Sequence, residues 1–148
     1  MNISAPDILL VEDSPTSAEL FVFALEANQS SATIQVVRDG VEALDFLLDG
    51  DGAAARSGSA GNALPRLVLL DLHMPRLDGF QVLERLRADE RTRLLPVVIL
   101  SSSDQESDKR EAYRLGANGY ISTPVGFKNS CEIIAQLERE WLGAAGEN

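Results

Sequence analysis

The feature of this 148-residue sequence that most restricts its fold is a repeated alternation of short apolar runs and helical patterns. Short, continuous apolar runs without polar alternation are typical of strands that are buried on both faces, as in a parallel sheet. Five such runs occur along the chain, at 7–12, 33–38, 66–71, 96–101 and 119–122. We therefore predict five strands that share one sheet.

Helix start and stop signals lie between these runs. Ser14 followed by Pro15 is typical of an N-cap and a first helical residue, Asp39 and Asp78 are further N-cap candidates, and Gly116 is a stop signal. The predicted helices cover 16–27, 41–48, 79–87, a segment from just after 103–104 to about 115, and about 126–141. This βα alternation predicts an α/β doubly wound fold, a parallel sheet with helices on both faces.

Length and composition favour one cytoplasmic domain. The apolar and charged fractions, 45% and 24%, are ordinary for a globular protein. A net charge of −10 repels phosphate backbones, so we expect no nucleic-acid binding. The single cysteine, Cys131, excludes an intramolecular disulfide and fits a reducing compartment. No segment approaches the roughly 18 apolar residues of a membrane span, so we expect no membrane contact.

We expect a single domain over 1–148 with its core in 7–142. A Gly-, Ala- and Ser-rich stretch at about 49–64 lacks apolar periodicity and is predicted to be a flexible insertion in a helix-to-strand connection. Only six residues follow Leu142, which leaves no room for an output domain.

Acidic side chains follow the first and third apolar runs. Glu12 ends the first run and Asp13 follows it, and Asp71 ends the third. Ligands of open doubly wound sheets bind beyond the carboxyl ends of the strands, where these carboxylates should converge. Like charges so close favour a cation, and few hard oxygen ligands favour Mg²⁺. Two plainer alternatives stay open, because Asp13 alone could cap the next helix and surface acids could simply keep the chain soluble.

Residues with hydroxyl groups lie at the carboxyl ends of the fourth and fifth apolar runs. Ser101 ends the fourth apolar run, where its hydroxyl could bind an anion near Asp71, and Ser122 and Thr123 follow the fifth. The neighbouring serines at 102–103 have the simpler interpretation of turn residues.

Four segments together resemble the receiver domains of two-component response regulators, the CheY-like superfamily. They read ILLVEDSP, LVLLDLHMPRLDGFQVLERLR, PVVILSSS and GANGYISTPV, and they span nearly the whole chain. The run DLHMPRLDG after an apolar strand, with the acid pair 58 residues earlier, is the most specific part. The resemblance implies a flavodoxin-like strand order of 2-1-3-4-5 and a chain that receives a phosphoryl group without being a dedicated enzyme.

The resemblance also implies a role for each residue of the site. Asp71 matches the phosphoacceptor, and Ser101 matches the hydroxyl that hydrogen-bonds the acyl phosphate. Tyr120 matches the aromatic switch residue. The implied Mg²⁺ ligands are Asp13 directly, Glu12 through water, Asp71, and the backbone carbonyl of His73.

Three further segments resemble the small single-domain regulators encoded beside bacterial phytochromes: RDGVEALDFLL, RADERTRLLPVVILSSS and EREWL. This narrower likeness implies a light- or redox-sensing histidine kinase as phosphodonor. It also implies a homodimer through the fourth helix, the fifth strand and the last helix. Aromatic residues, which are favoured at interfaces, lie on those elements at Tyr113, Tyr120, Phe127 and Trp141.

One position departs from the family. Receiver domains place a Lys before the Pro of the fifth strand-to-helix loop, and this chain has Thr123 there. A Lys at this place gives a charge-assisted hydrogen bond worth roughly 1.5–3 kcal/mol. We expect phosphotransfer to survive, because metal and in-line geometry dominate it, and the conformational response to weaken.

The alternative function is therefore a degenerate receiver that binds or dimerises without phosphorylation. Enzymes on similar folds fit less well. Haloacid-dehalogenase phosphatases need a second Asp where this chain has His73, and flavodoxins need a phosphate-holding loop where Glu12 and Asp13 would repel phosphate.

Overall fold

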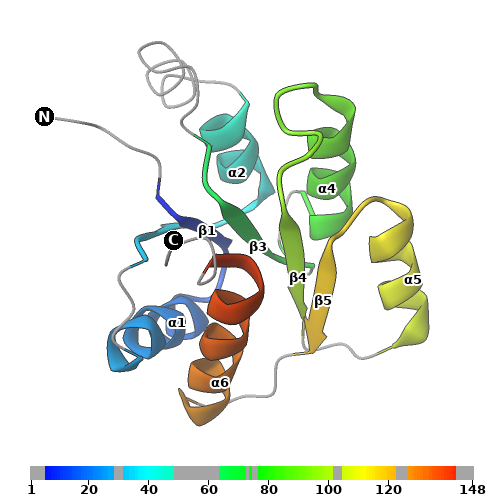
Figure 1. Ribbon diagram of the computed structural model, residues 1–148. Helices are drawn as coiled ribbons and strands as arrows, with labels where there is room; N and C mark the ends of the chain where they lie inside the picture. The colour runs from blue at the N-terminus through cyan, green and yellow to red at the C-terminus, as the bar shows by residue number, and fades with distance from the viewer. Residues whose placement is uncertain are drawn as a thin grey trace, which may run out of the picture.

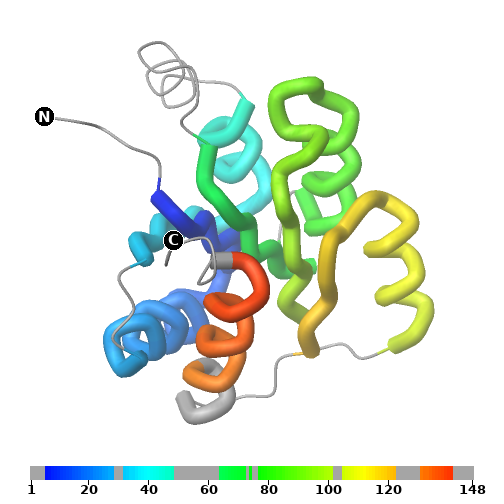
Figure 2. Tube along the Cα trace, in the orientation of Figure 1, coloured from blue at the N-terminus to red at the C-terminus, as the bar shows by residue number. Residues whose placement is uncertain are grey.

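The chain forms one parallel sheet covered by helices (Figures 1 and 2). The computed structural model describes residues 6–28, 32–48, 64–72, 74, 77–101, 105–122 and 127–142, and the side chains of all of these except 127–130 and 142. The elements within them, in chain order, are β1 (Ile8–Val11), α1 (Pro15–Ala27), β2 (Ile34–Val37), α2 (Gly40–Leu47), β3 (Leu67–Asp71), α4 (Gly79–Ala88), β4 (Val97–Ser101), α5 (Glu106–Arg114), β5 (Gly119–Ser122), α6 (Phe127–Leu137) and a π-helical turn, η1 (Glu138–Leu142).

The strands run in the order β2-β1-β3-β4-β5, and every neighbouring pair is parallel. This confirms the predicted fold class and strand order. Helices α1 and α6 lie side by side on one face of the sheet, and α2, α4 and α5 cover the other (Figure 1). All strands therefore end at one edge of the sheet, where the site is expected.

The central strands are apolar throughout because both of their faces are buried. In β1, Leu9 and Val11 belong to the core under α2, α4 and α5, whereas Ile8 and Leu10 belong to the core under α1 and α6. β3 and β4 alternate in the same way, since successive side chains of a strand point to opposite faces. The edge strands β2 and β5 are only partly buried.

The predicted N-caps of three helices are confirmed. The side chains of Ser14, Asp39 and Asp78 accept hydrogen bonds from the backbone of the first turns of α1, α2 and α4. Helix α5 differs, because its N-cap is Gln105 and no side-chain bond closes it. It ends just before Gly116, whose φ of 109° explains the glycine at this stop.

The last helix packs an apolar face against the sheet. Ile134 and Leu137 are buried, and Cys131 and Trp141 pack against the same core. The side chain of Phe127 lies outside the described residues, as do residues 49–63 of the predicted insertion. Across the described part of the chain, no helix is both long and apolar enough to cross a membrane.

Arginines hold the loops at the amino end of the sheet. Arg87 of α4 donates to the carbonyls of Gly116 and Thr92 and to Oδ1 of Asn118, at 2.9–3.0 Å. Asn118 Oδ1 also accepts from the Val97 amide, which joins the start of β4 to the turn before β5.

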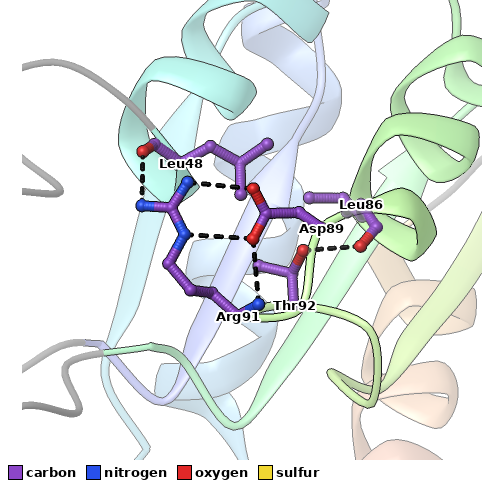
Figure 3. A network of polar contacts seen from close by, with 5 residues as sticks. All are labelled: Leu48, Leu86, Asp89, Arg91 and Thr92. Carbon is purple, nitrogen blue, oxygen red and sulfur yellow. Dashed lines mark hydrogen bonds and ion pairs between the residues drawn. The ribbon is translucent and has the colours of Figure 1, made fainter.

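A second arginine joins α2 to the turn after α4 (Figure 3). Arg91 donates through two guanidinium nitrogens to the Asp89 carboxylate and through a third to the Leu48 carbonyl, at 2.9–3.0 Å. In the same turn, the buried Thr92 hydroxyl donates to the Leu86 carbonyl at 2.6 Å. The pKa of Asp89 falls to about 2, because Arg91 hydrogen-bonds its carboxylate.

Candidate functional site

Three carboxylates meet at the carboxyl edge of the sheet. β1 and β3 are adjacent, with Val11 opposite Leu70, so the residues that follow them emerge side by side. One carboxylate oxygen from each of Glu12, Asp13 and Asp71 lies within 4.8 Å of the others. The predicted convergence of these side chains is therefore found in the structure.

The backbone around the acid pair is held by neighbouring elements. The Glu12 amide donates to the Val37 carbonyl of β2 at 3.0 Å, and Glu12 Oε2 accepts from the Ser14 amide at 3.1 Å. The N-cap of α1 is Ser14, whose hydroxyl accepts from the Ser17 amide at 3.3 Å. Helix capping therefore does not explain Asp13, which is exposed beside the other two carboxylates.

The pKa of Glu12 is raised from 4.5 to about 7. Burial is the main cause, because it disfavours the charged form, and the Asp71 carboxylate adds to it. The hydrogen bond from the Ser14 amide opposes the rise without cancelling it. Near neutral pH the cluster thus holds a proton that a cation could displace.

The acceptor candidate Asp71 and the hydroxyl of Ser101 belong to adjacent strands. Asp71 is the half-buried last residue of β3 and pairs with Leu100 of β4. Ser101 follows Leu100, is 1% exposed, and lies opposite Ser122 of β5. The strand order thus places Ser101 at the end of the strand that pairs with β3, one residue beyond the partner of Asp71.

Tyr120 lies two residues before the end of β5, further from the carboxyl edge than Ser101. It pairs with Ile99, is half-buried, and packs against the core under α2, α4 and α5. The ammonium of Lys109 on α5 lies 6.0 Å from the centre of its ring, within the range of a cation–π contact. Lys109 lies within the helix predicted to end near residue 115, and no sequence signal joins residues on different elements in this way.

Two predicted site residues, His73 and Thr123, lie outside the described residues, as do the serines at 102–103. Their assigned roles stay predictions.

The described geometry is that of a cation site with oxygen ligands. Three carboxylates from two strands are the hard donors that divalent cations such as Mg²⁺, Mn²⁺ and Ca²⁺ accept. The raised pKa of Glu12 fits this interpretation, because burial, and after it the nearby Asp71 carboxylate, disfavours the anion that a bound cation would stabilise. The residues present therefore fit a divalent metal ion.

Comparisons with known proteins agree with this geometry. Residues 8–135 match the family described as the response regulator receiver domain. The chain is 38% identical over 136 residues to the probable methanogenesis regulatory protein FilR2 of Methanothrix harundinacea, covering 92% of this chain and 83% of that protein. It is 32% identical over 136 residues to response regulator Rcp1 of Synechocystis, covering 91% and 88%.

Solved structures of similar proteins share the whole fold. The phosphorylated cyanobacterial phytochrome response regulator RcpA superposes with a TM-score of 0.82 at 32% identity, over 95% of this chain and 96% of that one. The Mn²⁺-bound form of Rcp1 superposes with a TM-score of 0.75 at 30% identity, over 93% and 94%. From its carboxylate cluster, its strand order and these matches, the chain belongs to the response regulator receiver domain family of two-component signalling.

Proposed function

We propose that this protein accepts a phosphoryl group on Asp71 from the phosphohistidine of a sensor histidine kinase. The observation that supports this most strongly is the meeting of Glu12, Asp13 and Asp71 within 4.8 Å at the carboxyl edge of the sheet. A carboxylate oxygen of Asp71 attacks phosphorus, the P–N bond to the imidazole breaks, and the imidazole leaves with the electron pair. The product is an acyl phosphate on this chain.

Mg²⁺ is the proposed cofactor. Asp13 is proposed to bind it directly, Glu12 through water, and Asp71 and the His73 carbonyl to complete the protein ligands. Its charge, when bound, offsets the negative charge of the phosphoryl oxygens during transfer. The Mn²⁺-bound form of Rcp1, a relative of similar fold, supports a divalent ion in this family.

The chain's own residues position the reacting groups. The Asp71 backbone belongs to β3, a central strand, so its carboxylate is presented from a rigid element. We assign to the buried Ser101 hydroxyl a hydrogen bond to a phosphoryl oxygen. Ser101 and Tyr120 then form the proposed switch, since a ligand that pulls on Ser101 acts on the strand that pairs with Tyr120.

The proposed phosphodonor is a kinase associated with a bacterial phytochrome. The likeness to Rcp1 and to the cyanobacterial phytochrome response regulator RcpA supports this choice. We further propose a cytoplasmic, single-domain protein that signals by protein–protein contact, without nucleic acid or membrane, and that is not a dedicated enzyme.

Intact-protein mass spectrometry after incubation with acetyl phosphate and Mg²⁺ tests the proposal. The native chain should gain one phosphoryl group, and Asp71→Asn should gain none. The control Asp78→Asn, an N-cap of α4 in the same connection, should be labelled like the native chain. Equal labelling of native protein and Asp71→Asn contradicts the assignment.

The second candidate function, a phosphorylation-independent binding module, is favoured by Thr123. Its hydroxyl offers one neutral hydrogen bond where a Lys offers a charge and three donors. NMR of native protein and Thr123→Lys, before and after beryllofluoride, separates the two functions. We expect larger shift changes over residues 101–123 in Thr123→Lys, with labelling intact in both. A full native response that Thr123→Lys does not enlarge removes the degenerate-receiver alternative.

The proposed homodimer uses α5, β5 and α6. Tyr113 of α5 is 51% exposed, which leaves an aromatic side chain available on that surface. Sedimentation velocity at tens of micromolar should show a dimer. A monomer both with and without phosphorylation contradicts this part of the proposal.

A further inference from the structure

Two buried glycines lie against the connection between Asp71 and α4. Gly79 is the first residue of α4, and Gly40 is the first residue of α2. Neither has a positive φ, so backbone conformation does not explain the glycine at either position. Neither position has room for a side chain, because a Cβ at either one would lie 2.5 Å from a backbone carbonyl oxygen.

Gly79 lies directly on the backbone of the acceptor residue. A Cβ there would meet the Asp71 carbonyl oxygen at 2.5 Å and the Leu72 Cα at 2.9 Å. The Gly79 amide donates to the Leu72 carbonyl at 3.0 Å, which closes the connection on itself. The start of α4 and the end of β3 are therefore in backbone contact.

Gly40 touches the same connection from another helix. A Cβ there would meet the Leu77 carbonyl oxygen at 2.5 Å, its Cβ at 2.9 Å, and Cγ2 of Val82 at 2.7 Å. Leu77 precedes Gly79 by two residues, so the first turn of α2 presses on the backbone that leads into Gly79.

The position of Gly40 is itself determined by the sheet. Its neighbour Asp39 is buried and caps α2 by accepting from the Glu42 amide at 2.9 Å. The preceding strand, β2, ends at Val37, whose carbonyl accepts from the Glu12 amide at 3.0 Å. The β2–α2 junction is thus joined to the residue that supplies one of the three carboxylates.

We infer that Gly40, on α2, is a positioning residue for the acid cluster. Because Gly40 has no side chain, α2 packs directly against the backbone of Leu77. This contact fixes the position of Gly79, which in turn fixes the backbone of Asp71. This rests on the proposed phosphoryl-acceptor function and identifies a residue remote in sequence on which its geometry depends. A Cβ at 2.5 Å needs a displacement of about 1 Å to reach ordinary van der Waals contact. Carbonyl oxygens of a closed loop cannot turn away as a flexible side chain can.

The test compares glycine-to-alanine variants of the full chain, using Mg²⁺ calorimetry and acetyl-phosphate labelling well below the melting temperature. Gly40→Ala should bind Mg²⁺ at least about tenfold more weakly than native protein and should be labelled at least about tenfold more slowly, because a misplacement of about 1 Å can cost up to about 100-fold. Gly119→Ala is the matched control, since a Cβ there meets Val98 at an ordinary 3.4 Å. It should behave like native protein in both assays.

Two further measurements separate positioning from general packing. Amide hydrogen exchange of Gly79, which donates to Leu72, should accelerate in Gly40→Ala and not in Gly119→Ala. Adding Val82→Ala to Gly40→Ala relieves the side-chain contact but not the Leu77 carbonyl, so Mg²⁺ affinity should stay low. Its recovery would place the effect in α2–α4 packing and overturn the inference.

Should Gly40→Ala fail to fold, Leu77→Gly removes the Cβ that faces Gly40 and loosens the same contact. It should also weaken Mg²⁺ binding, and native affinity in Leu77→Gly contradicts the inference. Native protein that neither binds Mg²⁺ nor labels overturns the proposed function, and the inference with it. Native protein that does both, with Gly40→Ala within twofold of it, overturns the inference alone.

Discussion

At the two ends of the parallel sheet, the pKa values of carboxyl groups are shifted in opposite directions. At the amino end, Asp89 lies against the Arg91 guanidinium, and its pKa falls to about 2. At the carboxyl end, Glu12 is partly buried beside Asp71 and Asp13, and its pKa rises to about 7, first because burial disfavours the anion and second because Asp71 is negatively charged. The same type of group is thus stabilised as an anion at one end and disfavoured as an anion at the other.

This difference in pKa shifts indicates that the amino end of the sheet contributes to stability, whereas the carboxyl end carries the proposed functional site. Hydrogen bonds at the amino end join α2, α4 and the turns before β4 and β5. The acids at the carboxyl end raise the free energy of the metal-free protein, a cost that a bound cation relieves. The unfavourable electrostatic interactions therefore lie at the edge of the sheet that is proposed to bind the metal ion. Four measurements can test this difference between the two ends.

The largest expected effect is on metal binding. Asp13→Ala should weaken Mg²⁺ binding at least about 100-fold, and Glu12→Ala about tenfold, because a direct ligand outweighs one that acts through water. Calorimetry measures both. Asp89→Ala, a carboxylate removed from the opposite end, should bind Mg²⁺ like native protein. If Asp13→Ala binds as tightly as native protein, the proposed pocket is wrong.

The next effect is on stability and comes from the amino end. Arg87→Ala should lower the free energy of unfolding by about 2 kcal/mol, because the acceptors on Gly116, Thr92 and Asn118 lose a charged donor. Urea unfolding measures the loss, and Mg²⁺ affinity should not change. Arg85→Ala, on the exposed side of the same helix, is the control and should stay within about 0.5 kcal/mol. A loss of Mg²⁺ affinity in folded Arg87→Ala would show that the amino end also contributes to metal binding, which contradicts this separation.

A smaller effect is the pH dependence set by Glu12. In the metal-free protein this carboxyl keeps its proton up to about pH 7, whereas in the unfolded chain it ionises near 4.5. Its contribution to stability is therefore present below 4.5 and lost as pH rises through about 7. Mg²⁺ needs the ionised form, so its apparent affinity should be about tenfold weaker at pH 6 than at pH 8.

Calorimetry at the two pH values, with thermal unfolding with and without Mg²⁺, measures this dependence. The stabilisation by Mg²⁺ should be larger at pH 8. Glu12→Gln cannot ionise and should abolish most of the difference. A dependence that persists in Glu12→Gln assigns the titration to another group.

The smallest expected effect follows replacement of residues 50–64 by a short Gly-Ser turn. The helix before this segment ends at Leu47 and the strand after it begins at Leu67, both at the amino end of the sheet. Closure cost depends weakly on loop length, so acetyl-phosphate labelling should stay within about threefold. Loss of labelling in a folded variant would put this segment at the active edge.

Much of the fold could be predicted from sequence because its signals are local. Apolar runs such as 66–71 are long enough to be strands and too continuous for one-sided burial, which indicates a parallel sheet. Ser14, Asp39 and Asp78 cap their helices through bonds to residues three positions on, within reach of a sequence pattern. Helix α5 is the exception, since Gln105 caps it without a side-chain bond.

The candidate site divides in the same way. That Glu12, Asp13 and Asp71 follow strands can be read from sequence, and parallel topology brings strand ends to one edge. The pKa of Glu12 could not be predicted, because it depends on how deeply the carboxyl is buried and on how near Asp71 lies. The contact of Lys109 with Tyr120 likewise depends on how α5 packs beside β5.

The sequence by itself determined the elements, their caps and the kinds of group at the strand ends, because backbone propensity and apolar periodicity act over a few residues. Only the tertiary structure decided which groups touch. Gly40 and Leu77 are far apart in the chain, yet a single missing Cβ lets α2 rest on the connection that leads from Asp71 to α4. Close packing is the reason, since a displacement of about 1 Å in a dense interior must be passed to the neighbours.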